Sequence, residues 1–484
     1  MSFLLRKGRL GSPEASAVEF ASSIEEDRRI ATASVLVNEA HVAALVKARI
    51  VDRDDGRKLA LVLRRLENNP PFRKGVEDIH VLIEEEVARR LGVRIGGKLH
   101  TGKSRNDQVT TAIRMVLRQE LLKLANQILA FELQLIRIAR KHRKSLFVGY
   151  THLQPAQPIT FAHYLLAVGD SLLRDHQRIM ETFGRVNLSP MGAGALAGSS
   201  FKLDRQLVAR LLGFRGIVEN TLDAVGGRDF LLEALGVCSI LALDLSRICQ
   251  DLVFYSSADV GLINLPDEFT STSSIMPQKK NPDVLEVVRA RCAQVAGNFS
   301  TATTTLHALS TGYNLDFQEL TPLLWDSLDT LESCLKVLTK LVEKVGPSGN
   351  TPGPHVEFTV ATEVANVLVR EGKLPFREAH RAVGRAVRLA LTRDCHLQDL
   401  EKKDWEKLLS TEITPRILAK IGEATDLNSQ VESYRTRGSP NPSETGRMIS
   451  TRQRGIAVLR NRNDRLLNGI SLAILELHRI SRKS

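Results

Sequence analysis

The stretch KSRNDQVTTAIRMVLRQELLKLANQILAFELQLIRIARKHRKSLFV, residues 103–148, decides the fold class, because it contains neither glycine nor proline. Apolar residues recur in it at helical spacing, among them Ile113, Leu117, Leu121 and Leu124. The pattern predicts one helix of about 36 residues, which at about 1.5 Å per residue forms a rod of roughly 55 Å. Such a rod is longer than a compact single-domain bundle usually needs.

Four more long stretches with apolar stripes follow this one. They are residues 161–182, 230–260, 282–310 and 321–345. Five such helices with little strand pattern between them predict an all-α fold built on an elongated central five-helix bundle. Because several stripes are wide, we expect part of this apolar surface to pack against other subunits.

Breaks in the helical pattern divide the chain into three mostly helical domains. Residues 1–106 form an N-terminal helical domain of shorter helices, interrupted at residues 69–71 (Asn-Pro-Pro). Residues 107–350 form the central long-helix bundle, and the glycine- and proline-rich run 346–354 marks its end. Residues 351–484 form a C-terminal helical domain, in which the residues after Arg447 are expected to be a helical C-terminal extension.

Composition narrows the class of protein. The chain has 484 residues, and neither an apolar run of about 18 residues nor a signal-peptide pattern is found, which predicts a cytoplasmic protein without membrane association. The five cysteines lie far apart without metal spacing, so we expect no disulfide and no metal. The run 140–144 is interpreted as a solvated helix end.

The formal charge of +12 fits either nucleic-acid binding or a small polyanionic substrate. Aromatic residues make up 5% of the chain, too few for base-stacking platforms, and no nucleic-acid-binding or nucleotide-binding motif occurs. We therefore expect a small-molecule substrate, no nucleic acid and no cofactor.

Three polar segments stand at the ends of the predicted long helices. They are GKLHTGKSRNDQ at 97–108, GYTHLQPAQP at 149–158 and TSTSSIMPQKKNP at 270–282. All three are rich in side chains that can hydrogen-bond to carboxylates. Each one alone could also be a helix-connecting turn, because Ser, Asn, Gly and Pro serve capping and backbone roles there.

Together the three segments resemble the fumarase/aspartase superfamily. Its pattern S-S-x-M-P-x-K-x-N-P matches residues 273–282, and its pattern T-H-x-Q-P-A-Q-P matches residues 151–158. The S-R-N-D-Q at 104–108 is similar to argininosuccinate lyases rather than to fumarase, aspartase or adenylosuccinate lyase. The resemblance covers about residues 25–447 and implies a cofactor-free β-elimination of argininosuccinate to arginine and fumarate, the last step of arginine biosynthesis.

The resemblance also implies the catalytic roles. His152 and Ser273 are the acid/base pair, in an order that the sequence leaves open, and Glu286 pairs with the histidine. Lys279 is the cation for the aci-carboxylate, with Asn281 as a substrate-binding amide beside it. Because serine is a poor base at its free pKa, Ser273 needs a helix dipole or Lys279 to stabilise its alkoxide.

The other residues carried over as substrate-binding are Ser104, Arg105, Asn106, Thr151, Tyr313, Gln318 and His80. Two of them have an alternative interpretation from the residues alone. Tyr313 could be a packed aromatic, and His80, which follows Glu77 and Asp78, could be a surface helix residue.

This chain departs from the family pattern at three positions within the match. Asn38 stands four residues after Ser34, where the family has a carboxylate-binding serine four residues after an aspartate. Thr272 replaces a glycine of the serine loop, and Thr321 stands where a lysine that would meet a substrate carboxylate is usual. Either another cation substitutes for this lysine, or the substrate is a related succinyl adduct.

The resemblance implies a homotetramer whose active sites each combine segments from three chains. Two alternatives remain open. One is a superfamily lyase that releases fumarate from another succinyl adduct, such as adenylosuccinate or aspartate. The other is a non-catalytic structural protein, as lens crystallins are in this superfamily.

Overall fold

The computed structural model describes residues 11–349, 356–409 and 412–483. The predicted boundary between residues 350 and 351 lies outside these ranges. The first ten residues, on which the signal-peptide expectation rests, lie outside them too.

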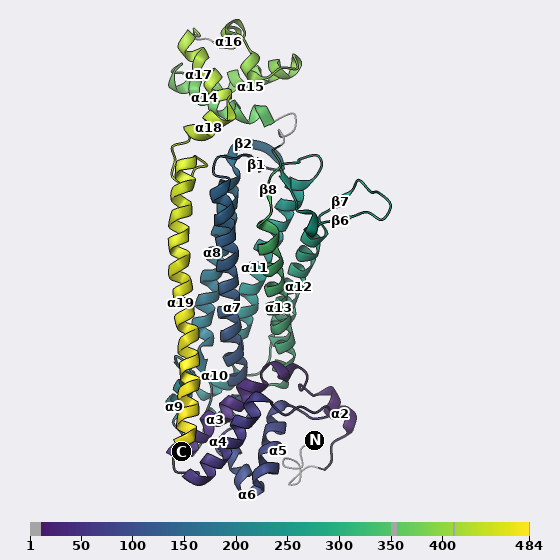
Figure 1. The fold of residues 1–484 in the computed structure, drawn as a ribbon, viewed down its shortest axis with the longest axis vertical. Helices are drawn as coiled ribbons and strands as arrows, with labels where there is room; N and C mark the ends of the chain where they lie inside the picture. The colour runs from purple at the N-terminus through teal and green to yellow at the C-terminus, as the bar shows by residue number, and fades with distance from the viewer. Residues whose placement is uncertain (1–10, 350–355, 410–411, 484) are drawn as a thin grey trace.

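Five long helices run side by side along the long axis of the molecule (Figure 1). They are α7 (Arg105–Lys141), α8 (Phe161–Val186), α11 (Asp229–Ser256), α12 (Asp283–Leu306) and α13 (Leu320–Val342). The first has 37 residues, close to the predicted length, and the other four begin within one residue of their predicted starts. The all-α architecture and the central five-helix bundle are confirmed.

The start of α7 is fixed by a capping box. The Ser104 hydroxyl accepts a hydrogen bond from the Asn106 N–H, and the Ser104 N–H donates to Asp107 Oδ1 at 3.0 Å. The second oxygen of Asp107 accepts from the N–H groups of Gly192 and Gly194, at 3.0 and 2.9 Å. The buried carboxylate of Asp107 thus ties a glycine-rich loop to the N-terminus of α7.

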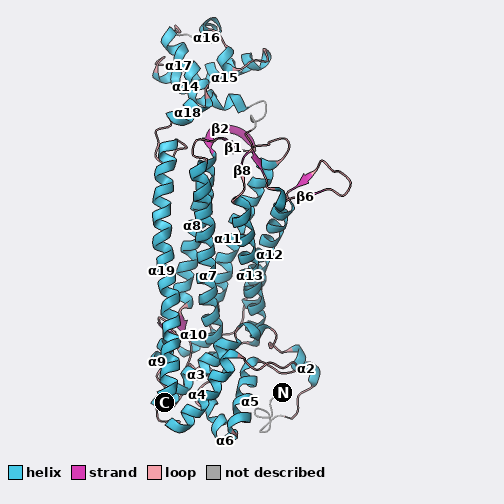
Figure 2. Ribbon diagram, in the orientation of Figure 1, coloured by secondary structure: helices cyan, strands magenta, loops and turns pink. Residues whose placement is uncertain are grey.

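Strands are few and short (Figure 2). Two antiparallel hairpins matter for the site: β1 (Leu146–Thr151) with β2 (Gln154–Thr160), and β6 (Ser271–Thr272) with β7 (Lys280–Asn281). The other pairs are β3 (Leu188–Ser189) with β4 (Gly216–Ile217), and β5 (Ile263–Asn264) with β8 (Gly346–Pro347). The loop between β6 and β7 projects from the side of the bundle (Figure 1).

Shorter helices lie at both ends of the bundle (Figure 1). At one end are α2 (Ala15–Phe20), α3 (Ala31–Lys47), α4 (Arg53–Asn68), α5 (Ile79–Leu91) and α6 (Val93–Gly96), with α9 (Arg205–Leu211) and α10 (Thr221–Gly226) nearby. At the other end are α14 (Ala361–Arg370), α15 (Phe376–Thr392), α16 (Lys402–Leu408), α17 (Pro415–Thr425) and α18 (Leu427–Ser433). Residues 360–424 enclose a hydrophobic core of their own.

The last helix, α19 (Pro442–Lys483), runs back along the whole bundle and ends beside the N-terminal helices (Figure 1). Its residues Met448, Ile456, Ile470 and Leu477 are buried in the same core as the bundle and α3. The predicted C-terminal extension is therefore most of a helix that packs on the bundle. The two predicted boundaries between the three domains remain predictions.

Three further expectations concern the basic run 140–144, the cysteines and membrane-spanning helices. The run 140–144 lies at the C-terminal end of α7, largely exposed, which confirms the solvated helix end. All five cysteines are free, and four of them are buried. No helix in the described ranges is both long and apolar enough to cross a lipid bilayer.

Candidate active site

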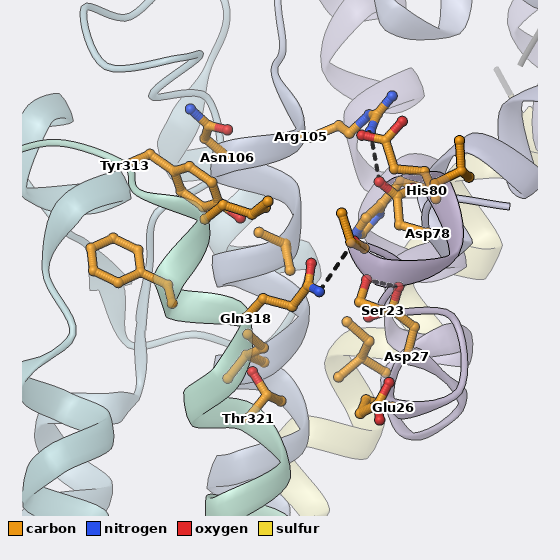
Figure 3. Close-up of a pocket in the computed structure, with 18 of the residues that line it drawn as sticks. Ser23, Glu26, Asp27, Asp78, His80, Arg105, Asn106, Tyr313, Gln318 and Thr321 are labelled. Atoms are coloured by element: carbon orange, nitrogen blue, oxygen red, sulfur yellow. Dashed lines mark hydrogen bonds and ion pairs between the residues drawn. The ribbon is translucent and has the colours of Figure 1, made fainter. Parts of the chain in front are cut away.

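A cavity of about 340 Å³ lies at the end of the bundle that carries the N-terminal helices. The cavity brings together Asn106 at the start of α7, Tyr313 and Gln318 around the 3-10 helix η4 (Leu315–Glu319), and Thr321 at the start of α13 (Figure 3). These residues are far apart in the sequence, and three of the four were predicted to bind substrate. The fold therefore brings them together around one cavity.

The three polar side chains at the start of α7 have different hydrogen-bond partners. Arg105 donates from Nη1 to Glu77 Oε1 and to Asp78 Oδ2, both at 2.7 Å, so its charge is already balanced within the chain. Asn106 donates from Nδ2 to the carbonyl oxygen of Ala195 at 3.1 Å. Ser104 serves as the N-cap of the helix rather than lining the cavity.

The opposite wall is formed by the residues around η4. Tyr313 packs edge to face on Phe317, with 5.6 Å between the ring centroids, and it also lines the cavity. It is therefore a packed aromatic residue, and its role in substrate binding stays a prediction. Its burial raises the pKa of its hydroxyl. Gln318 donates from Nε2 to the carbonyl oxygen of Ala21 at 3.3 Å (Figure 3).

His80 lies in the cavity wall and is 3% exposed, so its interpretation as a surface helix residue is wrong. Neither ring nitrogen has a hydrogen-bond partner among the described residues. Burial lowers the pKa of the imidazole to about 4, which keeps it neutral. A buried neutral ring with unsatisfied nitrogens is suited to hydrogen-bond a ligand.

The polar cavity residues that the sequence did not predict include Ser23, Asp27 and Arg228. Burial raises the pKa of Asp27 to about 7, although its carboxylate accepts from the Ser23 hydroxyl at 2.9 Å and from the Ile79 N–H at 3.1 Å. In sequence, Asp27 sits inside the run EEDRR, which is typical of a solvated surface. That pattern gave no signal for burial.

Arg228 is 4% exposed and lies just before α11. Its Nη1 donates to the carbonyl oxygens of Val225 and Gly227, and its guanidinium stacks 4.3 Å from the centre of the Phe317 ring. Burial lowers its pKa to about 10, so the group stays charged. Within the described residues it forms no ion pair, which leaves a buried cation in the cavity wall.

Asn38 does not line this cavity. It is fully buried in α3, where its Oδ1 accepts from Lys103 Nζ at 2.7 Å and from Gln108 Nε2 at 3.2 Å. The departure from the family pattern at Asn38 therefore affects how segment 97–108 is held. The serine that does line the cavity is Ser23.

The other predicted catalytic residues lie at the opposite end of the bundle. Thr151 and His152 are exposed at the tip of the β1–β2 hairpin. His152 and Leu153 form its two-residue turn with φ of 56° and 57°, a left-handed conformation that is costly for these residue types. Strain of this kind persists where the surrounding structure holds it, often at functional sites.

Ser273 lies on the projecting β6–β7 loop. Its Oγ accepts hydrogen bonds from the N–H groups of Ile275 and Met276, at 3.3 and 3.1 Å. Thr272 pairs with Lys280 in the short ladder, so this departure from glycine occupies an extended position that suits threonine. The two backbone donors would favour negative charge on the Ser273 oxygen.

The base of the same loop borders a second cavity, of about 540 Å³, lined in part by Lys279, Asn281 and Glu286. Glu286 lies 4.0 Å from Arg289 on the next turn of α12. In the described part of the chain no hydrogen bond or ion pair joins His152 to Ser273 or Glu286. The predicted pairing of His152 with Glu286 is not formed within one chain.

The predicted residues thus form two separate groups. The length of α7, about 55 Å at 1.5 Å per residue, separates Asn106 at its start from His152 beyond its end. We call the predicted residues that line the first cavity the cavity group: His80, Arg105, Asn106, Tyr313 and Gln318. We call the predicted residues at the two hairpins and the adjoining start of α12 the hairpin group: Thr151, His152, Ser273, Lys279, Asn281 and Glu286. One chain holds both groups without bringing them together.

The chain is similar in sequence to known lyases. A family profile described as "Lyase" matches residues 14–297, and one described as "Argininosuccinate lyase C-terminal" matches residues 358–432. The argininosuccinate lyase of Methanocaldococcus jannaschii is 36% identical over 99% of this chain and 98% of its own. That of Methanosarcina acetivorans is 39% identical over 94% of this chain and 93% of its own.

Solved structures show the same fold. EDDS lyase in complex with formate is 25% identical, with a TM-score of 0.87 over 98% of each chain. Class II fumarase from Schistosoma mansoni, at 16% identity and a TM-score of 0.70 over 88% of this chain and 96% of its own, shows likeness of fold alone. The chain therefore belongs to the argininosuccinate lyase family of carbon–nitrogen lyases, within the fumarase/aspartase superfamily.

Proposed function

We propose that this protein catalyses the reversible cleavage of argininosuccinate to arginine and fumarate, as the last step of arginine biosynthesis in the cytoplasm. The observation that carries the proposal is the convergence of Asn106, Tyr313 and Gln318 on one cavity. Near-full-length relatives named argininosuccinate lyase support the same substrate. The free cysteines suit a reducing compartment.

The charges around the cavity fit this substrate. Argininosuccinate carries two carboxylates at its succinyl end, a carboxylate and an ammonium group at its arginine end, and a guanidinium that links the two halves. Arg228 is a buried cation without an ion-pair partner in the described residues, so it can meet a carboxylate where the family usually has a lysine at Thr321. Glu26 and Asp27 on the facing wall can meet the guanidinium.

The elimination assigns tasks to three residues of the hairpin group. A base removes a proton from Cβ of the succinyl group, the adjacent carboxylate takes up the charge, and Lys279 stabilises it. The C–N bond then breaks, a double bond forms in fumarate, and an acid donates a proton to the departing guanidinium nitrogen. The two N–H donors to Ser273 Oγ favour its alkoxide, so we assign Ser273 as base and His152 as acid.

We infer that the enzyme is a homotetramer in which each site draws on three chains. The separation of the cavity group from the hairpin group supports this, because neither holds a complete set of residues. Exposed apolar side chains on the bundle, Ile240 and Leu243 of α11 and Val287 of α12, offer surface for packing between chains.

Fumarate release, followed by ultraviolet absorbance, tests the proposal. Purified protein is expected to form fumarate from argininosuccinate and not from adenylosuccinate or aspartate. Fumarate from one of the latter alone would establish the related-adduct alternative, and no fumarate from any of them would favour a structural role. Light scattering is expected to give the mass of four chains.

A further inference from the structure

The C-terminal end of α19 packs against α3 and α4, far from the hairpin group (Figure 1). Three side chains meet there, one from each helix: His478 of α19, Glu39 of α3 and Glu67 of α4. One ligand atom from each lies within 4.8 Å of the others. No step of the proposed reaction uses these residues.

Glu39 is 0% exposed, and neither of its carboxylate oxygens has a hydrogen-bond partner in the described structure. A buried carboxylate without partners must either hold a proton or face a cation. Among the described residues, no hydrogen bond offsets the burial of this carboxylate.

The polar side chains around Glu39 lie close together but leave part of their hydrogen-bonding capacity unused. His478 Nε2 lies 3.0 Å from Glu67 Oε2 and 3.7 Å from Glu39 Oε2, yet it makes no hydrogen bond of normal geometry. Ser481, almost one turn further along α19, is 4% exposed and lies near Glu39 without a hydrogen bond of normal geometry in the described structure. Four polar groups therefore lie together with hydrogen-bonding capacity that is not fully used.

The separations fit a metal ion. Ligands held at about 2.0–2.2 Å around a tetrahedral ion lie roughly 3.3–3.6 Å from one another, close to both distances measured from His478. One imidazole nitrogen and two carboxylate oxygens suit a borderline ion such as Zn²⁺ rather than Ca²⁺. Arg64, which donates to the carbonyl oxygen of His478 at 3.1 Å, balances part of the negative charge of the two glutamates.

We propose that Glu39, Glu67 and His478 bind a divalent transition-metal ion of the Zn²⁺ class, which clamps the end of α19 onto α3 and α4. The clamp has a structural role, because its ligands lie outside the cavity group and the hairpin group. It acts on α3, whose Asn38 holds Lys103 and Gln108 of segment 97–108. The ion would therefore stiffen the helix from which the start of the cavity is positioned.

The test titrates Zn²⁺ alone into chelator-treated full-length protein, in competition with a chromophoric chelator. The wild type is expected to bind one Zn²⁺ per chain tightly. Glu67→Gln and His478→Gln are each expected to weaken that binding by at least tenfold. His380→Gln, an exposed histidine of α15 outside the cluster, is the matched control and should bind Zn²⁺ as the wild type does.

Thermal unfolding gives a second readout that is independent of activity. Added Zn²⁺ is expected to raise the Tm of the wild type and of His380→Gln, and to leave the Tm of Glu67→Gln unchanged. Glu67 is partly exposed, so Glu67→Gln is expected to fold. If His478→Gln does not fold, Glu67→Gln alone decides the test. The proposal is overturned if the wild type binds no more Zn²⁺ than Glu67→Gln, or if its Tm does not respond.

Discussion

Mixing two variants with impaired activity provides a direct test of a site assembled from several chains. Asn106→Ala damages the cavity group, and Ser273→Ala damages the hairpin group. The structure places these two groups at opposite ends of one bundle, about 55 Å apart. If a working site takes its cavity from one chain and its serine loop from another, hybrid tetramers should contain intact sites although every chain carries a defect.

The expected recovery follows from counting. In a random 1:1 mixture, the cavity of a site comes from the Ser273→Ala chain in half of the cases, and the loop comes from the Asn106→Ala chain in half. About one quarter of the sites are therefore intact. Loss of a hydrogen bond to a charged substrate group costs about 1.5–3 kcal/mol, or roughly 10- to 150-fold in rate, so residual activity stays below this quarter.

The assay dissociates the two purified variants together in mild denaturant, removes the denaturant and follows fumarate release. Recovery of about one quarter of the wild-type kcat is expected. The matched control mixes Asn106→Ala with Gln318→Ala, which damage the same cavity, so every site stays defective and no recovery is expected. Equal recovery in both mixtures, or none in the first, would refute the assignment of the two groups to different chains.

Three further predictions concern single substitutions. Ser273→Ala should abolish turnover, while calorimetry still detects substrate binding and light scattering still finds the assembled protein; unchanged turnover would remove the serine from the catalytic roles. Asp107→Ala leaves the N–H groups of Ser104, Gly192 and Gly194 without their acceptor, so the free energy of unfolding in urea should fall by about 3 kcal/mol or more. Burial raises the pKa of Glu132 to about 8, so between pH 4.5 and 8 the native state keeps a proton that the unfolded chain releases, and stability falls as the pH rises. Glu132→Gln should remove a loss of about 2–3 kcal/mol between pH 5.5 and 7.5 in urea unfolding, and an unchanged pH dependence would contradict this.

The long helices could be predicted from the sequence because their signals are local. Residues 105–141 show a helical period, lack glycine and proline, and begin at a capping box, and each of these features acts within a few residues. The direction in which α19 packs has no such local signal. Its apolar stripe indicates that one face is buried, but the partner is chosen by the whole fold, so its return along the bundle came from the structure.

The cavity residues likewise include some that the sequence could predict and some that it could not. Asn106, Tyr313 and Gln318 carry family motifs in sequence, and the structure brings them together. Asp27 and Arg228 could not be identified, because a charged residue in sequence predicts exposure unless a partner is visible. Their burial depends on contacts between α7, η4 and the N-terminal helices, which no local pattern describes.

The two missed residues also bear on the substrate. Arg228 offers a buried positive charge on one side of the cavity, and Asp27 offers a carboxyl with a pKa of about 7 on another. A small dicarboxylate without a cationic group, such as fumarate, would use the arginine and leave Asp27 protonated and unmatched. A guanidinium beside Asp27 would favour its ionised form and lower its pKa, because an opposite charge stabilises the carboxylate. The cavity is thus completed electrostatically by a ligand that carries carboxylates and a guanidinium together, which is the combination that argininosuccinate has and fumarate lacks.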